Sequence, residues 1–395
     1  MSILLVITGA VISVFVFYQL ILAVFSIGRT GQSPVSTIAD SELSRFAVVI
    51  PAHNEEVLIE GLVASIRSAD YPQDKVDIHV IADNCTDSTA ELAKAAGAQC
   101  HERNDLEHRG KPWALDWLFQ KLDHDNYDAY TIIDADTIID GAYLRAMDSS
   151  IRSGKQAIQG YFGVMNPDEN WLTRLSILPG ILRYIMQCPG KERLGLSCPL
   201  AGNGMCFSSD VIRTYGWKAY SMAENWEYYA ILTLEGIQVV HEPGAIIYSQ
   251  VANSLKEGKA QRMRWMRGRM DTLKRYGPRL LAETFSKMSL RYIDVAMELM
   301  RPSHAMLFLS VCGYLILSTL LVAFAGLSAG FFYAALVLFV AQVSFFLSGL
   351  VIQRAPLKTW LSLVWVPVYL VWKLLVSFKG LVMLGDKRWV KTRRN

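Results

Sequence analysis

Apolar residues form two long uncharged blocks, one near each end of the chain. The first, residues 3–27, carries no acidic or basic side chain, and about 20 apolar residues are enough to span a bilayer. It lacks the basic start and the small-residue cleavage site of a signal peptide. The pattern therefore predicts a retained transmembrane helix over residues 1–28, followed on the cytoplasmic side by Arg29.

The second block has no Asp, Glu, Lys or Arg between Arg301 and Arg354. That length is enough for two crossings, so we expect a transmembrane hairpin over residues 301–353. Residues 354–384 are ambiguous, since tryptophans there accompany lysines and a proline, and the alternatives are an interfacial, a re-entrant or a third C-terminal membrane segment. A full crossing would export a tail with five basic residues. We therefore favour an interfacial or re-entrant segment and a basic cytoplasmic tail over residues 385–395.

Between these blocks, short apolar runs alternate with helical patterns, which predicts an α/β domain over residues 45–255. The expected strands are Phe46–Pro51, Val76–Asp83, Tyr130–Asp134 and Gln156–Val164, and the expected helices are 55–68, 88–97, 111–122 and 141–153. Strands separated by such helices indicate a mainly parallel sheet that binds ligands at the carboxyl ends of its strands. Residues 256–300 are expected to form amphipathic or interface helices.

Composition narrows the class of protein. The chain has 395 residues with 39 basic and 36 acidic side chains, and 52% of its residues are apolar. This apolar content excludes a disordered or collagen-like chain. The net charge of +3 gives no reason to expect a nucleic-acid partner. The six cysteines contain no CxxC pair, so neither a disulfide framework nor a zinc site is indicated.

Polar residues with possible chemistry follow the expected strands. Asp83 ends the second strand, where an acid can accept hydrogen bonds from a base or a sugar. Lys111 begins a helix, which suits a phosphate ligand, although without further context a solvated basic turn is the favoured interpretation. Strand alternation would place Asp134 and Asp136 on one side of the sheet. Such a pair binds Mg²⁺ or Mn²⁺, although Asp is also common in turns.

Two further clusters lie on expected helices. Glu224 and Asn225 open an acidic helix start, where an acid can simply complement the helix dipole. Gln261, Arg264 and Trp265 are spaced i, i+3 and i+4, so they share one helix face. The competing interpretation is a basic amphipathic helix that lies on a membrane surface.

The order of these motifs resembles the family 2 glycosyltransferases with a GT-A fold. PAHNEE, DNCTDST, GKPWALD, DAD, GNG, an acidic helix start and QRMRW follow one another between residues 45 and 275. The branch that the chain most resembles contains the membrane synthases of hyaluronan, chitin and cellulose, which match the membrane segments only in layout. The resemblance implies a Rossmann-like GT-A catalytic domain over residues 45–255, a UDP-sugar donor, and Mg²⁺ or Mn²⁺ as cofactor.

The same resemblance implies a nucleotide-sugar site. Its residues would be Pro51, Asn54, Glu55, Asp83, Lys111, Asp134, Gln261, Arg264, Trp265, Thr392 and Arg393. Asp83 would contact the uracil and ribose, while Asp134 and Asp136 would hold the metal ion. The QxxRW motif would bind the diphosphate and frame the acceptor entrance. Thr392 and Arg393 would belong to a loop that covers the nucleotide.

One position departs from the family pattern. The family usually has Glu-Asp at the acidic helix start, with the Asp as catalytic base, and this chain has Glu224-Asn225. An amide cannot accept the acceptor's proton. The base would then be Glu224 or Glu227, one helical turn further along, and Glu224 is the favoured candidate.

The resemblance implies an inverting membrane glycosyltransferase that extends a cell-surface or exopolysaccharide. The alternatives are a single-addition transferase that uses a lipid-linked acceptor and an inactive nucleotide-binding membrane scaffold. The expected partners are the UDP-sugar, a carbohydrate or lipid-linked acceptor, membrane lipids, and a second copy or an export protein. The expected location is the plasma (inner) membrane, with the catalytic domain in the cytoplasm.

Overall fold

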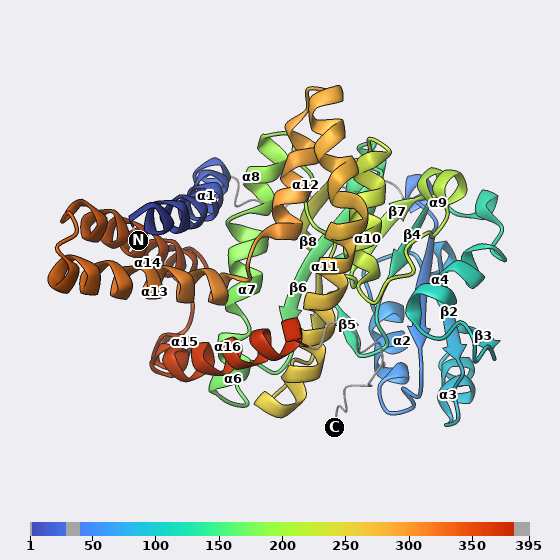
Figure 1. Cartoon of the computed structure of the whole chain (residues 1–395). Coiled ribbons are helices and arrows are strands. Elements are labelled where there is room, and N and C mark those ends of the chain that lie inside the picture. Colours follow the sequence, from blue (N-terminus) through green and yellow to red (C-terminus); the bar gives the residue numbers. More distant parts are fainter. Residues whose placement is uncertain (1, 29–39, 383–395) are drawn as a thin grey trace.

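The computed structural model describes residues 2–28 and 40–382. The predicted tail 385–395, with Thr392 and Arg393, and the predicted position of Arg29 lie outside these residues. Figure 1 shows an α/β domain joined to a lobe of long helices.

An eight-stranded mixed sheet forms the centre of the α/β domain, in the order β3-β2-β1-β4-β7-β6-β8-β5. The strands are β1 (Phe46–Ala52), β2 (Val76–Asp83), β3 (Gln99–Arg103), β4 (Ala129–Ile132), β5 (Thr137–Ile139), β6 (Ala157–Val164), β7 (Met205–Ser208) and β8 (Val239–Ser249). The half formed by β3, β2, β1 and β4 is parallel, in the register Phe46↔Val76 and Phe46↔Ala129. The other half contains antiparallel pairs made by β7 and β5. The predicted α/β class is confirmed.

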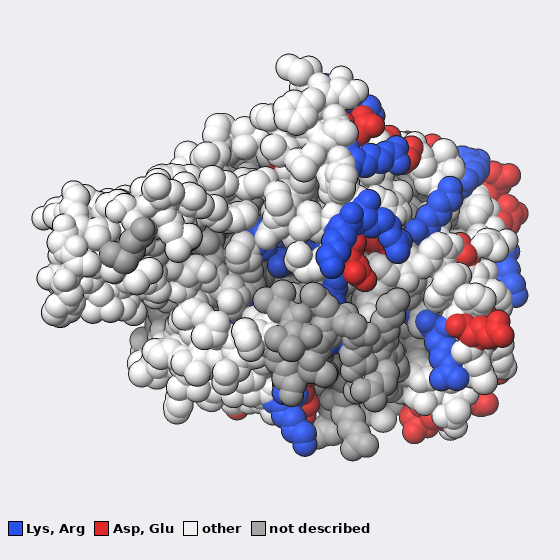
Figure 2. Space-filling model, viewed as in Figure 1, with Lys and Arg blue, Asp and Glu red and all other residues white. Residues whose placement is uncertain are grey.

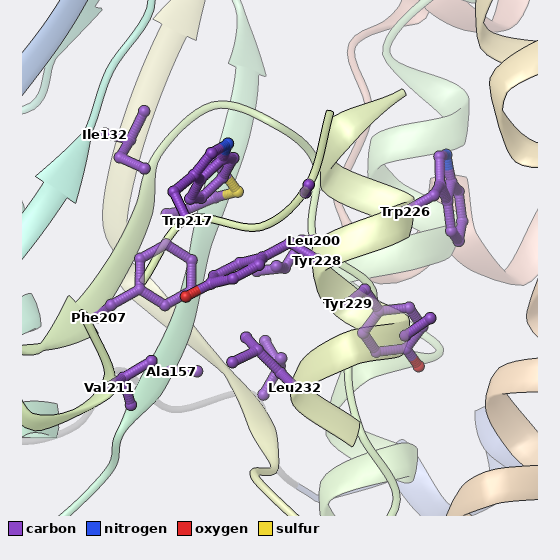
Figure 3. Packing of buried hydrophobic residues seen from close by; sticks show 14 of the residues in the cluster. Ile132, Ala157, Leu200, Phe207, Val211, Trp217, Trp226, Tyr228, Tyr229 and Leu232 are labelled. Carbon is purple, nitrogen blue, oxygen red and sulfur yellow. The ribbon is translucent and has the colours of Figure 1, made fainter. Parts of the chain in front are cut away.

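Helices cover both faces of this sheet. One apolar core lies under α2 (Ile59–Arg67), α3 (Thr89–Ala95) and α5 (Tyr143–Arg152), and the other lies under α4 (Lys111–Phe119), α9 (Ser209–Tyr215), α10 (Glu224–Leu234) and α12 (Leu290–Met300). Trp217 packs inside the second core, with its ring centre 4.4 Å from that of Tyr228 (Figure 3). Central strands buried on both faces read as continuous apolar runs, which explains why the sequence revealed them.

Short elements connect the main ones. They are η1 (Asp40–Glu42), η2 (Gln73–Lys75), η3 (His124–Asn126), α6 (Trp171–Leu175), α7 (Leu178–Gly180), the π-helical turn η4 (Ile181–Ile185) and α8 (Cys188–Arg193). The long helix α11 (Leu255–Ser286) then packs against α10, α12 and the last helix of the chain. It therefore links the α/β domain to the helical lobe.

Four helical segments are long and apolar enough to cross a membrane. They are α1 (Ser2–Ser26), α13 (His304–Ala325), α14 (Gly330–Ile352), and Leu357–Phe378 within α15 (Leu357–Leu361), η5 (Ser362–Trp365) and α16 (Val366–Val382). Helix α1 packs against α13 and α14, and the buried amide of Gln19 donates a hydrogen bond to Gln342. Figure 2 shows that this lobe is almost free of charge on the visible face.

The last segment is arranged differently from the hairpin. Figure 1 shows α16 directed toward the α/β domain, and α16 contacts α11. Its composition allows a crossing, so its interfacial or re-entrant placement stays a prediction.

Candidate active site

Three charged side chains meet at the carboxyl end of β4. Lys111, the first residue of α4, donates hydrogen bonds to the Asp134 carboxylate and to the carbonyl of Gly202. Its Nζ lies 3.6 Å from Oε1 of Glu224, the first residue of α10. The exposed fractions are 20% for Lys111, 38% for Asp134 and 14% for Glu224. A ligand can therefore reach a set of groups that chain positions far apart have brought together.

The two aspartates lie in a turn, and the expectation that the strand Tyr130–Asp134 reaches Asp134 was wrong. Strand β4 ends at Ile132, and the amide of Thr137 donates to the Asp134 carbonyl at 3.1 Å. Strand alternation therefore does not place Asp134 and Asp136. The turn places them, because its backbone hydrogen bond closes the chain around both residues.

Asn203 holds this turn against the sheet. Its side-chain oxygen accepts from the Asp134 amide at 3.0 Å, and its Nδ2 donates to Thr137 at 2.8 Å and to Ser249 at 3.2 Å. Asn203 is 3% exposed, so these bonds form away from water. In the sequence, GNG stands only as one of the ordered motifs that resemble the family. Sequence reasoning did not assign Asn203 this role, because the partners are distant in sequence.

Burial and neighbouring charges act against each other in the cluster. Burial raises the pKa of Glu224 above that of an ordinary glutamate, the Lys111 ammonium opposes the rise, and Asp134 adds to it. Arg264 also opposes it, so the guanidinium is close enough for its charge to act on Glu224. Burial alone would lower the pKa of Lys111, but the two carboxylates hold it above the ordinary value. The lysine therefore stays charged.

The donor set fits a divalent ion that shares its ligands with a substrate. The described residues contain no group of three or more His, Cys, Asp or Glu side chains arranged to hold a metal. Asp134 and Asp136 supply only two carboxylates. Mg²⁺ prefers oxygen ligands and often takes one or two carboxylates plus substrate phosphates. The Asp134 and Asp136 carboxylates lie in one turn, and two carboxylates so close in the chain would attract a divalent cation.

Glu227 has a different environment from Glu224. It is 1% exposed, and its oxygens accept from the Ser221 amide at 2.7 Å, Arg275 at 2.6 Å and Tyr276 at 3.0 Å. These bonds connect α10 to the middle of α11. Glu224 faces the Lys111 cluster, whereas Glu227 faces α11.

Asn225 makes a bond that an aspartate could not make. Its Nδ2 donates to the Leu200 carbonyl at 2.7 Å. An ionised Asp in the same place would present an oxygen to that carbonyl, so the pair would repel. The amide at this position therefore fastens the start of α10 to the chain segment before Gly202.

Asp83 is buried at the end of β2. It is 4% exposed, and its Oδ1 accepts from Arg103 at 2.6 Å, while its Oδ2 accepts from the Gly110 amide at 3.1 Å. These bonds join β2, β3 and the loop before Lys111. Sequence reasoning missed Arg103, because it ends a short edge strand and belongs to no motif.

The loop after β1 lies against the loop after β2. The side-chain oxygen of Asn54 accepts from the Thr86 amide at 2.8 Å, and the Glu55 amide donates to Thr89 at 2.8 Å. Asn54 has a positive φ of 55°, which the short side chain of Asn tolerates. Pro51 is the second-to-last residue of β1, directly before this loop. The predicted nucleotide-binding segments thus form one surface with Asp83 beneath it.

Gln261, Arg264 and Trp265 lie in the first half of α11, and Trp265 is 48% exposed. A glycine one turn later allows α11 to approach the start of α10. A Cβ on Gly268 would lie 2.3 Å from the Cβ of Ala223, the residue before Glu224. No side chain fits there, so Gly268 brings the Arg264 turn beside the cluster.

Residues 44–268 match the family model described as "Glycosyltransferase like family 2". The chain belongs to glycosyltransferase family 2. Among curated relatives, the probable glycosyltransferase YdaM of Bacillus subtilis is 26% identical over 240 residues, covering 58% of this chain and 56% of YdaM. The poly-beta-1,6-N-acetyl-D-glucosamine synthase of Staphylococcus aureus is 26% identical over 247 residues, covering 59% and 57%. The chain thus matches little more than half the length of these relatives.

Among solved structures, the mannosyltransferase PcManGT of Pyrobaculum calidifontis, in complex with GDP-Man and Mn²⁺, has a TM-score of 0.59 and 16% identity. The match covers 97% of this chain and 100% of that protein, so the shared fold includes the helical lobe. At this identity the likeness concerns the fold alone. It confirms the GT-A fold of a family 2 glycosyltransferase flanked by apolar helices.

Proposed function

We propose that this glycosyltransferase transfers a sugar from a UDP-sugar to a growing polysaccharide, with inversion at the anomeric carbon. The observation that carries the proposal is the meeting of Lys111, Asp134 and Glu224 at the carboxyl end of the sheet. A relative that covers the same region is named as a polysaccharide synthase. The helical lobe suits an enzyme that works at a membrane, and we infer that its catalytic domain faces the cytoplasm.

The donor would lie across the edge formed by the β1, β2 and β4 loops. Its base would rest on the surface above Asp83, and its diphosphate would face Lys111 and Arg264. Asp134 and Asp136 would hold Mg²⁺ or Mn²⁺ against the diphosphate. PcManGT binds GDP-Man with Mn²⁺, so guanine is the alternative base that the experiment must include.

The chemistry requires one proton transfer and one bond exchange. Glu224 accepts the proton of the acceptor hydroxyl while that oxygen bonds to the anomeric carbon. The bond between this carbon and the diphosphate breaks, and the nucleoside diphosphate leaves with the electron pair. The positive charges of Lys111 and Arg264 stabilise the charge that develops on the leaving group. A bound divalent ion would contribute further neutralisation of the diphosphate.

A second acceptor class is a lipid-linked sugar that receives a single residue. The observation that favours it is a group of basic side chains near α16, described in the next subsection. An inactive scaffold remains the alternative of another class, and its only support is Asn225 in place of the usual Asp.

Radiolabelled transfer assays with the full chain in lipid nanodiscs test the proposal. Panels of UDP- and GDP-sugars are supplied with Mn²⁺, Mg²⁺ or EDTA, and the products are separated by size. We expect label transfer from a UDP-sugar that EDTA abolishes, and an Asp136→Ala loss on the order of 100-fold or more. A long product indicates a polymer, and one discrete lipid product indicates the second acceptor. If no donor gives either sugar transfer or nucleotide release, the enzyme is refuted in favour of the scaffold.

A further inference from the structure

Basic side chains from three elements meet where α11 passes α16. Arg262 and Arg269 belong to α11, Lys373 to α16 and Arg183 to the π-helical turn η4. All four are half-buried. Arg183 and Arg269 both lie over the ring of Trp226, at 5.6 and 5.9 Å from its centre. We refer to the four cations as the basic cluster.

Lys373 lies within range of the charges on the two α11 arginines. The Arg262 guanidinium is 5.6 Å from the ring centre of Tyr369 and 5.3 Å from that of Trp372, both on α16. Aromatic rings of this kind favour the headgroup level of a membrane. The basic cluster therefore has walls that suit a lipid headgroup.

The basic cluster has no carboxylate of its own among residues 2–28 and 40–382. None of its four members forms an ion pair within that part of the chain, whereas other buried cations are paired. The acid whose charge acts on Arg269 is Glu298, which is bound to Arg301 at 2.7 Å and lies 3.7 Å from Lys191. Burial, together with Arg301 and Arg183, lowers the pKa of Arg269 to about 10.

Gathering like charges in a half-buried site is unfavourable unless an anion offsets them. Arginine and lysine supply several donors that match phosphate oxygens. The chemistry of the cluster therefore points to a phosphate-bearing ligand.

The basic cluster differs from the proposed diphosphate site. Arg262 and Arg269 are seven residues apart, so they share one face of α11. Arg264 is two residues from Arg262, which places it on nearly the opposite side of the helix, next to Glu224. One helix thus presents cations in two directions, one toward the cluster of Lys111 and one toward α16.

We propose that the basic cluster binds the phosphate group of a lipid that carries the acceptor. This inference rests on the proposed function, because it specifies the acceptor of the same reaction. Trp226, which contacts two of the cations, lies only two residues along α10 from Glu224. A headgroup held there has its sugar beside the proposed base and its hydrocarbon chain along α16. The phosphate anchors the acceptor and takes no part in the bond exchange.

Binding of a short-chain lipid to the full chain tests this inference without any sugar transfer. The probe is dihexanoyl phosphatidic acid, titrated into the detergent-solubilised protein and followed by calorimetry. Dihexanoyl phosphatidylcholine, inorganic phosphate and UDP are titrated separately. The test variant is Arg262→Gln/Lys373→Gln, which removes one charge from each of two helices. The matched control is Lys274→Gln, which removes an exposed charge from α11 outside the cluster.

We expect the double variant to bind phosphatidic acid at least about tenfold more weakly, since each charge-assisted bond to phosphate contributes that much. Lys274→Gln should bind phosphatidic acid like the unaltered protein. UDP affinity should change less than about twofold in both variants, because their altered residues lie outside the proposed diphosphate site. Arg262→Lys, which keeps the positive charge, should bind phosphatidic acid almost as tightly as the unaltered protein. An unchanged thermal unfolding midpoint would show that the double variant is folded.

Equal binding of phosphatidic acid by the double variant overturns the inference and leaves the proposed function intact. Inorganic phosphate that binds as tightly as the lipid overturns the lipid as its source. Equal losses of UDP and lipid binding would make the cluster part of the donor site. A protein that binds no nucleotide but still shows the charge-dependent lipid binding contradicts the proposed function alone.

Discussion

Two lysines in this protein each lie between two carboxylates, yet their surroundings give them opposite roles. Lys191, at the junction of the helical lobe and the catalytic domain, bonds Asp294 at 2.7 Å and lies 3.7 Å from Glu298. The three side chains are 1 to 3% exposed. Arg301 adds a second cation, bound to Glu298 at 2.7 Å, so two positive charges balance two negative charges. This junction is neutral and dry.

Lys111 lies in a similar arrangement that is more accessible to water. Its partners Asp134 and Glu224 are 38% and 14% exposed, and no second cation forms an ion pair with either in the described part of the chain. Asp136 adds another negative charge in the same turn. A buried network with matched charges keeps one geometry, whereas carboxylates that water can reach can also be reached by a cation and a ligand. Exposure and charge balance, rather than residue types, separate the structural site from the chemical one.

The burial of the two sites also acts on their acids in different ways. Burial would raise the pKa of Glu298, but Arg301, Lys191 and Arg183 together hold it well below the usual range. Burial raises the pKa of Glu224, and the single lysine does not reverse the effect. Glu298 is therefore locked in its charged form, while Glu224 can take up a proton.

The largest effect should come from Glu224→Gln. The amide cannot accept the acceptor's proton, so we expect the turnover number to fall by about 10² to 10⁴ while UDP affinity stays within about twofold. Steady-state transfer and calorimetric UDP binding measure the two quantities. The unaltered enzyme should lose activity as pH falls through the raised pKa of Glu224, because only the ionised form is a base. This acid limb should be absent from the residual activity of the variant.

Glu227→Gln is the matched comparison on the same helix. Its carboxylate bonds α11, so we expect a loss of stability while the acid limb of the pH profile stays in place. Full activity in Glu224→Gln, or an acid limb that disappears only in Glu227→Gln, would reassign the base.

At the junction, Lys191→Met should reduce the free energy of unfolding by about 3 to 5 kcal/mol, because it leaves a buried carboxylate without its cation. The change can be measured by chemical unfolding in detergent. Lys111→Met should reduce it by about 1 kcal/mol or less, since Asp134, the carboxylate that Lys111 bonds, is 38% exposed and screened by water. The contrast between the two lysines would fail if both variants lost the same stability.

A double variant tests the charge balance directly. Lys191→Met/Asp294→Asn leaves Glu298 paired with Arg301, so it should recover most of the stability lost in Lys191→Met. If the double variant is less stable than Lys191→Met, charge balance is not the origin of the effect.

A smaller effect than that of Lys191→Met should come from Asn225→Asp. The new carboxylate faces the Leu200 carbonyl and loses the donated hydrogen bond, so we expect a loss of about 1 to 3 kcal/mol in the free energy of unfolding. The loss should be smaller at low pH, where a protonated Asp can donate again. Thermal unfolding at two pH values measures it, with Asn225→Ser as the control that keeps a donor. A gain in transfer activity would show instead that Asn225 had replaced a useful base.

Much of the fold followed from local patterns in the sequence. The strands β1, β2 and β6 and the helices α2 to α5 lie within a few residues of their predicted ranges. Their apolar runs and helical periods are local properties. The predicted end of the strand Tyr130–Asp134 was wrong, because the turn at Asp134 depends on a hydrogen bond to Asn203, a residue nearly 70 positions later. A pattern of neighbouring residues cannot predict a hydrogen bond between such distant positions.

The candidate site shows the same division. Lys111, Asp134 and Glu224 were all singled out from sequence, yet only the structure shows one ammonium between two carboxylates. The burial of Asp83 against Arg103, and the direction of Glu227 toward α11, also depend on long-range packing.

The sequence by itself determined which residues are candidates for chemistry, where the apolar segments lie, and the α/β class. These features depend on residue type and on spacing along the chain. The tertiary structure decided which charges are paired and which are left for a ligand. Lys191 and Asp294 are 103 residues apart, and Lys111 and Glu224 are similarly remote. Whether a charge is neutralised depends on distance in space and on access to water, which are properties of the folded chain.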